Sequence, residues 1–243
     1  MSSVTWLGHS CAVIRLDGVV VATDPVLRGR IFHLRRAAPV DPAVLDGVDA
    51  VLVSHVHFDH LDLPSLARID RAVPVVLPVG AGNLVRHRGF RDVREVHAGD
   101  EMDIGALRIR ATHAEHASTR RPCTSRAGSV GFVIAGTRSV YFAGDTDLFD
   151  EMATLGPIDL ALLPVAGWGP RLPPGHLDPQ RAAEALIRIR PRVAIPIHWG
   201  TYAPWRAPAS DETPARAFAE LAATSAPGIE VRVLRPGESY EFD

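Results

Sequence analysis

The stretch VLVSHVHFDHLD, residues 51–62, decides how the fold of this chain is interpreted. Its apolar run ends in three histidines and an aspartate within six positions, namely His55, His57, Asp59 and His60. Residues two apart in an extended segment point to the same side, so His55 and His57 face the same way. Asp59 and His60 follow as the chain turns into the next helix. A single metal ion cannot readily take all four ligands at this spacing, but two adjacent ions can. The stretch therefore predicts half of a two-metal centre.

Other metal-binding side chains follow other predicted strands. Asp145 comes after VYFAG, His198 comes after VAIPI, and His113 and His116 come after LRIRAT. The carboxyl ends of strands in α/β sheets are where ligand sites form. A lone histidine after a strand is usually an ordinary surface or core residue. Because such residues follow four predicted strands of this chain, we expect them to meet at one site.

Composition excludes several partner classes. The formal net charge is −2, and every basic residue apart from histidine is arginine. This balance gives no electrostatic argument for a nucleic-acid partner or for stable membrane association. The apolar runs are shorter than a membrane span, and the first residues show no secretory signal. Cys11 and Cys123 form no CxxC pair. These features predict a cytoplasmic location.

The hydrophobic pattern predicts strands and helices throughout residues 1–243, with no linker that would divide them. Asp17 and Gly18, between two β-rich segments, predict a hairpin turn. Residues 25–47 are expected to be irregular, either as a loop over a site or as a solvated run of charges. Asp178 and Pro179 predict the start of a helix over residues 178–190. We expect one α/β domain with two sheet layers and helices outside. Further strands are predicted over residues 48–54, 73–78, 106–112, 129–136, 138–144, 158–165 and 192–198, and further helices over 63–70, 81–89, 147–156 and 211–225.

These motifs resemble the metallo-β-lactamase superfamily, whose hallmark is H-x-H-x-D-H after a buried strand. The segments TWLGHSCAVIRLDGVVVATDP, SHVHFDHLD, ATHAEHASTR, YFAGDTDLFD, LLPVAGWGPRLPPGHLDPQRAAEA and PIHWGTY occur in the order of that family. The opening and the last two segments are similar to the branch that holds N-acyl-phosphatidylethanolamine phospholipase D-like and ascorbate-6-phosphate lactonase-like enzymes. The resemblance implies an αββα sandwich with a two-metal site at one edge.

The resemblance also implies a ligand set. His55, His57 and His116 would hold the first metal, Asp59, His60 and His198 the second, and Asp145 would bridge the two. His113 stands where this branch usually has proline, so two histidines compete for one ligand position. We assign His116 as the ligand and His113 as a neighbour that supports it.

Other residues receive supporting or catalytic roles. Asp24, in TDP, is expected to hydrogen-bond a ligating histidine. His9, in LGHS, is expected to do the same or simply to pack. His176, in PPGHLDP, aligns with a family position that contacts substrate or protonates a leaving group, the alternative being that it caps the following helix. Arg171 and the arginines of residues 28–36 are candidates to bind an anionic group.

The resulting hypothesis is a dinuclear metal-dependent hydrolase. A hydroxide that bridges two divalent ions would cleave a soluble ester, lactone or phosphodiester, and Asp59 would orient it and receive its proton. Zinc is the first expectation for the metal, although manganese and iron accept the same ligands. The expected partner is a small-molecule substrate, in one interpretation an anionic one. The alternatives are a metal-dependent nuclease, a non-hydrolytic di-iron redox protein and a metal-binding protein of the same fold.

Overall fold

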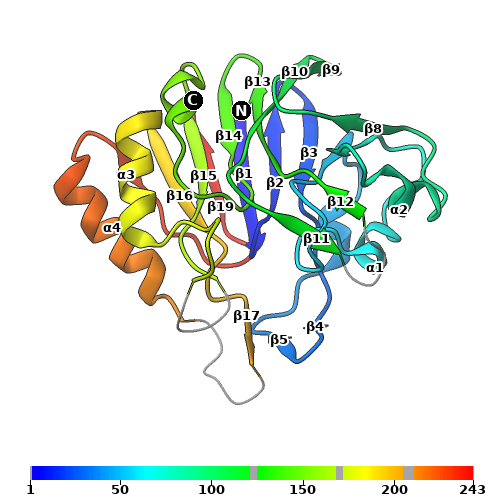
Figure 1. Cartoon of the computed structure of the whole chain (residues 1–243), viewed down its shortest axis with the longest axis horizontal. Coiled ribbons are helices and arrows are strands. Elements are labelled where there is room, and N and C mark those ends of the chain that lie inside the picture. The colour runs from blue at the N-terminus through cyan, green and yellow to red at the C-terminus, as the bar shows by residue number, and fades with distance from the viewer. Residues whose placement is uncertain (1, 121–124, 168–171, 205–210, 243) are drawn as a thin grey trace.

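The computed structural model describes residues 2–120, 125–167, 172–204 and 211–242, and two seven-stranded sheets form its centre (Figure 1). The first sheet has the order β19-β1-β2-β3-β6-β7-β8, and the second has the order β18-β16-β15-β14-β13-β10-β9. The strands of the first sheet are β1 Ser2–Gly8, β2 Cys11–Leu16, β3 Val19–Thr23, β6 Ala50–Leu52, β7 Val75–Pro78, β8 Val93–Val96 and β19 Ser239–Phe242. Those of the second are β9 Glu101–Ile104, β10 Leu107–His113, β13 Val130–Ala135, β14 Ser139–Phe142, β15 Leu160–Pro164, β16 Val193–Ile197 and β18 Glu230–Val231.

The main hydrophobic core joins the two sheets. Trp6 and Ile14 of the first sheet belong to the same buried cluster as Phe132 and Phe142 of the second. Burial of such side chains is the dominant favourable contribution to folding, at about 25 cal/mol per Å² of apolar surface. Helices cover the outer faces, with α3 Pro179–Ile189 and α4 Thr213–Ser225 on one side and α1 Leu63–Leu66 and α2 Gly82–Arg86 on the other (Figure 1). The αββα arrangement expected from the sequence is confirmed.

The parallel strands explain the continuous apolar runs of the sequence. β14, β15 and β16 pair in parallel, and every residue of β15 and β16 is buried. Parallel strands lie between helices and a second layer, so they are apolar on both faces. The predicted turn at Asp17 and Gly18 is also present, because both residues have positive φ, 51° and 79°, as a two-residue hairpin requires.

Helix α3 begins where its sequence predicts. The Asp178 side chain accepts a hydrogen bond from the backbone N–H of Arg181, and Pro179 occupies the first turn. Helices α1 and α2 are shorter than expected. The guanidinium of Arg71 donates to the carbonyls of Leu66 and Ile69 and so binds the end of α1. The helix expected over residues 147–156 is only a 3-10 turn, Asp150–Thr154.

Residues 25–47 are more ordered than the sequence suggested. They contain strands β4 Arg30–Ile31 and β5 Leu34–Arg36, which form a small sheet with β17 Tyr202–Pro204, and a 3-10 turn at Pro42–Leu45. Ile31 and Leu34 pack against Val26 and Tyr202 in a separate apolar cluster. The expectation of an irregular segment is therefore wrong, because three spaced apolar residues of this segment form a small core with Tyr202, and the surrounding arginines obscured that pattern in the sequence. A short sheet of β11 Ser118–Arg120 and β12 Ser125–Ala127 lies elsewhere. No helix within the described ranges has the length and apolarity needed to cross a membrane.

Arg36 fixes this small sheet to the rest of the molecule. Its buried guanidinium donates to the carbonyls of Val26, Leu7 and Ala38 and to the Tyr202 hydroxyl. Arg36→Lys should destabilise the fold by about 3 kcal/mol, because an ammonium cannot reach all these acceptors and leaves buried carbonyls unpaired. Chemical denaturation measures this change. The exposed neighbour Arg35 supplies the control, since Arg35→Lys should stay within about 0.5 kcal/mol. Equal stability of the two variants would contradict the assigned role of Arg36.

Candidate metal centre

Strands that run in the same direction bring the predicted ligands to one edge. β1, β3 and β6 of the first sheet share one direction, as do β10, β14 and β16 of the second. The segments that follow these six strands carry the histidines and aspartates of the site. They are His9, Asp24, His55, His116, Asp145 and His198. The placement follows the general rule for strand ends in α/β sheets.

The first group consists of His55, His57 and His116. Their ligand atoms all lie within 4.8 Å of one another. Nδ1 of His57 lies 2.9 Å from Nε2 of His55 and 3.3 Å from Nε2 of His116. Three imidazole nitrogens at this spacing can hold one divalent ion.

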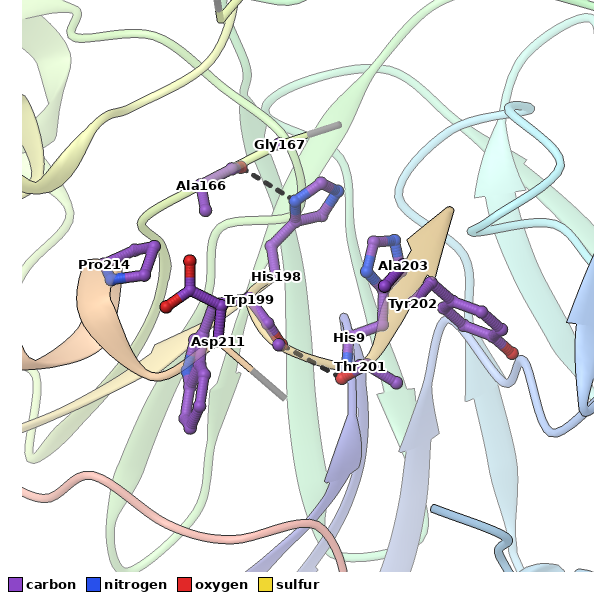
Figure 2. A pocket seen from close by; sticks show the side chains of 11 residues that line it. His9, Ala166, Gly167, His198, Trp199, Thr201, Tyr202, Ala203, Asp211 and Pro214 are labelled. Carbon is purple, nitrogen blue, oxygen red and sulfur yellow. Dashed lines mark hydrogen bonds between the residues drawn. The ribbon is translucent and has the colours of Figure 1, made fainter. Parts of the chain in front are cut away.

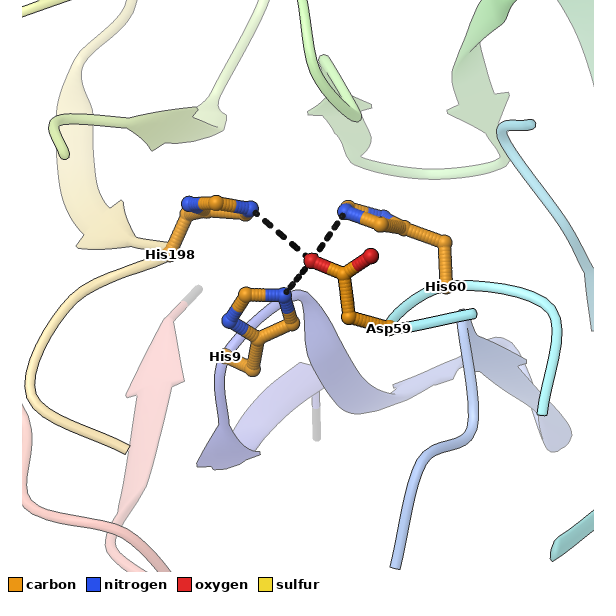
Figure 3. A group of neighbouring side chains, drawn as sticks. All are labelled: His9, Asp59, His60 and His198. Carbon is orange, nitrogen blue, oxygen red and sulfur yellow. Dashed lines mark hydrogen bonds and ion pairs between the residues drawn. The ribbon is translucent and has the colours of Figure 1, made fainter. Parts of the chain in front are cut away.

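The second group consists of Asp59, His60, His198 and His9, whose ligand atoms also lie within 4.8 Å of one another. Figure 3 shows the three rings pointing at one carboxylate oxygen, Oδ2 of Asp59. Nε2 of His9 lies 3.0 Å from that oxygen, Nε2 of His60 3.7 Å and Nε2 of His198 3.8 Å. This is a second set of nitrogen and oxygen donors suited to a divalent ion.

Asp145 lies between the two groups. Its Oδ2 is 3.8 Å from Nε2 of His55 and 3.2 Å from Nε2 of His60, and its Oδ1 is 3.3 Å from Nε2 of His198. The preceding Gly144 has φ +62°, and a Cβ on it would lie 2.5 Å from the Cβ of Ser54. Only glycine allows the two sheets to approach this closely, and that approach places Asp145 beside His55.

Hydrogen bonds set which ring nitrogen faces the centre. Nδ1 of His116 lies 2.8 Å from the carbonyl of Gly175, and Nδ1 of His198 lies 2.8 Å from that of Ala166. Since a carbonyl only accepts, each Nδ1 carries the proton and each Nε2 presents its lone pair to the site. Metal-binding histidines are commonly oriented in this way.

Asp24 and Ser54 orient two further ligands. Asp24 accepts from the Ser54 hydroxyl at 2.6 Å and lies 2.7 Å from Nδ1 of His60. Because the Ser54 hydroxyl donates to Asp24, its oxygen is free to accept from Nδ1 of His55, 3.0 Å away. The structure thus places Asp24 against a histidine of the second group, as the sequence hypothesis expects.

Charges in the site match the needs of a cation. Burial lowers the pKa of His55 well below its usual value and that of His116 to about 4, so both rings are neutral at pH 7. Burial alone would raise the pKa of Asp145 and of Asp59, but the surrounding histidines lower both well below the usual range. His60 is the exception: burial lowers its pKa, and Asp145, Asp59 and Asp24 together raise it well above normal. Neutral imidazoles and ionised carboxylates form the donor set that divalent metals require.

Two buried atoms test whether a metal fits. Nε2 of His60 and Oδ1 of Asp145 are buried, and their contacts, 3.2 Å to Oδ2 of Asp145 and 3.3 Å to Nε2 of His198, lack the geometry of hydrogen bonds. A buried polar atom without a hydrogen bond is costly and calls for an explanation such as a bound ion. Both atoms face the space between the ligand groups, so the residues present fit a metal.

Three of the predicted site residues lie close to the ligands in strained backbone conformations. His9, Asp24 and His198 have φ of 56°, 34° and 64°. Only a few per cent of residues other than glycine adopt this left-handed region, with asparagine, aspartate and histidine the most frequent, and such residues cluster at functional sites. Each follows a strand directly, so the chain turns sharply there and directs the side chain into the site.

His176 reaches the site from the segment before α3. Its Nε2 lies 3.4 Å from Oδ2 of Asp145, and its ring meets that of His116 edge-on with 4.8 Å between centroids. The α3 cap is supplied by Asp178, so the alternative that His176 caps the helix does not hold. Burial lowers the pKa of His176, but Asp145 outweighs it and the pKa is raised.

The structure does not bring His113 into the site. Its side chain is about half exposed and lies 3.3 Å from Glu115. The odd-numbered residues of β10 before it are buried, so the inward–outward alternation of the strand ends at His113, its last residue. Arg171 lies outside the described residues. Of the arginines in residues 28–36, Arg28 is paired with Asp62, and Arg36 is the buried anchor of the small sheet.

His9 is the residue whose position the sequence left open. Its ring is buried within the second ligand group, whereas the sequence interpretation had it either orienting a ligand or packing. The only sequence signal is its place in LGHS directly after a strand. A pocket of about 110 Å³ opens beside it, lined by His198, Trp199, Tyr202 and Asp211 among others (Figure 2).

Comparison with known proteins places this arrangement in a family. The beta-lactamase superfamily domain matches residues 20–199, and the chain belongs to that superfamily. A UPF0173 metal-dependent hydrolase of Methanopyrus kandleri is 35% identical over 246 residues, covering 98% of this chain and 99% of that protein. The N-acyl-phosphatidylethanolamine-hydrolyzing phospholipase D 1 of Caenorhabditis elegans is 31% identical over 226 residues, covering 82% of this chain and 64% of that protein.

A solved structure agrees with these relatives. Igni18, a metallo hydrolase from the archaeon Ignicoccus hospitalis, has a TM-score of 0.77 and 27% sequence identity, covering 100% of this chain and 99% of that one. The chain is therefore a metal-dependent hydrolase of the beta-lactamase superfamily. The family resemblance stated from the motifs is confirmed.

Asp24→Asn tests how the second ligand group is held. The amide keeps the size of the side chain but removes the charge that orients His60, so metal affinity should fall roughly 10- to 100-fold. Competition with a chromophoric chelator measures this affinity. Asp49→Asn changes an exposed carboxylate in the same way and should leave affinity unchanged. Wild-type affinity in Asp24→Asn would contradict the orienting role.

Proposed function

We propose that this hydrolase binds two divalent metal ions and cleaves a small ester, lactone or phosphodiester. The observation that carries the proposal is the position of Asp145 between two separate groups of ligand atoms. His55, His57 and His116 would hold one ion, Asp59, His60 and His198 the other, and Asp145 would contact both. When bound, such a pair supplies a hydroxide nucleophile near neutral pH and polarises the bond to be cleaved. Zinc suits this histidine-rich set, and manganese or iron would use the same residues.

Asp59 is the proposed proton acceptor. Its carboxylate remains ionised because neighbouring histidines lower its pKa, and each of its oxygens has more than one lone pair. One oxygen is held by His9, so the side chain has a fixed orientation at the site. From there it can accept a hydrogen bond from the attacking water and receive its proton.

His176 is the proposed proton donor to the leaving group. Its raised pKa keeps the ring protonated over more of the neutral range than an ordinary histidine. Its Nε2 lies beside Asp145, and the side chain retains some solvent exposure. A substrate bound between the ligand groups would therefore meet an acid at this edge of the site.

The size of the adjoining pocket supports a small-molecule substrate. The pocket of about 110 Å³ begins at His9 and His198, and aromatic rings form part of its wall (Figure 2). A carboxylate, Asp211, also lines it. A small ester, lactone or phosphodiester fits this volume better than a folded nucleic acid, whose recognition needs an extended basic surface.

Metal analysis combined with a substrate panel tests the function. The purified protein should contain about two metal ions per chain, and a panel of lactones, phosphodiesters and thioesters should identify the cleaved bond. His57→Ala should abolish hydrolysis, since it removes the nitrogen shared by the first ligand group. His97→Ala removes an exposed histidine outside the site and serves as the control. Hydrolysis that survives His57→Ala, or redox turnover without hydrolysis, would refute the proposal.

The pH profile tests His176 separately. An acid with a raised pKa is active below that pKa, so kcat should fall as the pH rises through it. His176→Gln should lower kcat roughly 100-fold and remove this alkaline limb while metal content stays at the wild-type level. An unchanged alkaline limb in the variant would assign the proton to another group.

A further inference from the structure

His9 connects the two sheets at the metal edge through its backbone. Its N–H donates to the hydroxyl of Thr201, and its carbonyl accepts from the N–H of His198 at 3.0 Å and from the indole N–H of Trp6 at 2.8 Å. His9 follows β1 of the first sheet, whereas His198 and Thr201 follow β16 of the second. The position of this residue is therefore fixed relative to ligands from both sheets.

The turn that carries His9 is built for close approach. Gly8 has φ +101°, and a Cβ there would lie 2.8 Å from the side chain of Thr201. His9 itself has φ 56°, in the left-handed region. A residue kept in this conformation needs surrounding contacts that compensate for its strain. Here those contacts are the three backbone hydrogen bonds, and their effect is to direct the imidazole inward.

The carboxylate of Asp59 lies against the ring of His9. Nε2 of His9 lies 3.0 Å from Oδ2 of Asp59 (Figure 3). The carboxylate is ionised and can only accept, so Nε2 of His9 must carry the proton. A nitrogen that donates its N–H to Asp59 has no lone pair left for a metal. His9 is thus set apart chemically from His60 and His198, although all three rings point at the same oxygen.

We propose that His9 is a positioning residue that holds Asp59 in the orientation needed to bind the second metal and to accept a proton. The proposal rests on the proposed two-metal function and assigns His9, unlike the other members of the second group, to the carboxylate rather than to the metal. Packing supports it, because the ring is buried and its centroid lies 4.0 Å from that of His198 and 5.8 Å from that of Tyr202, which is edge-on. These rings restrict His9 to the rotamer that meets Asp59.

Removing the donor should weaken one metal site selectively. His9→Leu fills similar space without an N–H, whereas the terminal amide of His9→Gln can donate near the position of Nε2. Titration with Co²⁺ reports each bound ion through its visible absorption. In His9→Leu the first ion should bind as in wild type, and the second should bind roughly 10- to 100-fold more weakly with an altered spectrum. His9→Gln should restore the second affinity to within about threefold, which a metal ligand replaced by an amide would not do.

Each outcome decides between explanations. If His9→Gln loses the second ion as fully as His9→Leu, His9 is a ligand and the proposal is wrong. If both variants bind two ions normally, His9 only packs, and the proposal is also wrong. Wild-type protein that binds fewer than two ions would instead contradict the proposed function itself, and with it this inference.

A measurement on the wild type covers the case in which a variant does not fold. Protein labelled with ¹⁵N-histidine and loaded with ¹¹³Cd²⁺ should show a protonated Nε2 on His9 without coupling to cadmium. His60 and His198 should show that coupling in the same sample. Coupling between cadmium and Nε2 of His9 would overturn the proposal.

Discussion

The site depends on one carboxylate, Asp145, buried between histidines that come from opposite sheets. Its oxygens lie within 4 Å of His55, His60, His176 and His198. An ionised carboxylate in such a position is costly unless positive charge or donors surround it. The neighbouring histidines supply hydrogen-bond donors and positive charge to Asp145, and a bound cation would compensate the rest of its negative charge. Asp145 therefore requires the two sheets to approach each other closely. They can do so because Gly144 has no side chain and Ser54 of the other sheet lies against it.

The same requirement explains the outer contacts of the site. Asp24, Ser54 and the carbonyls of Gly175 and Ala166 each take the ring nitrogen that faces away from the centre. The Asp24 carboxylate is held in turn by the backbone N–H of Ser54, so the imidazole of His60 is oriented before a metal arrives. Such preorganisation lowers the entropic cost of forming the site. It also means that supporting residues matter nearly as much as the ligands.

Much of this could be predicted from sequence because the ligands follow strands. The apolar run before His55, the VAIPI run before His198 and the VYFAG run before Asp145 each indicated a buried strand, and strand ends converge in parallel sheets. The resemblance to the superfamily supplied the pairing of ligands into two groups. Residues 25–47 were misjudged because the pattern of charges concealed Val26, Ile31 and Leu34, whose small core exists only once Tyr202 arrives from the distant end of the chain.

The directions of individual side chains were the second feature that could not be predicted from the sequence. His113 and His116 both lie near the end of β10, and alternation along the strand would place His113 on the buried face. Its half-exposed position is visible only in the structure. His9 posed the opposite problem, since one histidine in a turn carries no periodicity at all. Its backbone position is set by hydrogen bonds to Thr201 and His198, almost two hundred residues away. Contacts of that range are outside the reach of local patterns.

The left-handed backbone at His9, Asp24 and His198 has a consequence for how this protein can evolve or be engineered. Glycine would relieve the positive-φ backbone at each of these positions, although its greater freedom in the unfolded chain offsets part of that gain. At these three residues, however, the same change would delete an imidazole or a carboxylate from the site. At these three positions a substitution that raised thermal stability would therefore remove part of the site. Substitutions that stabilise the protein without this loss have to occur at other positions.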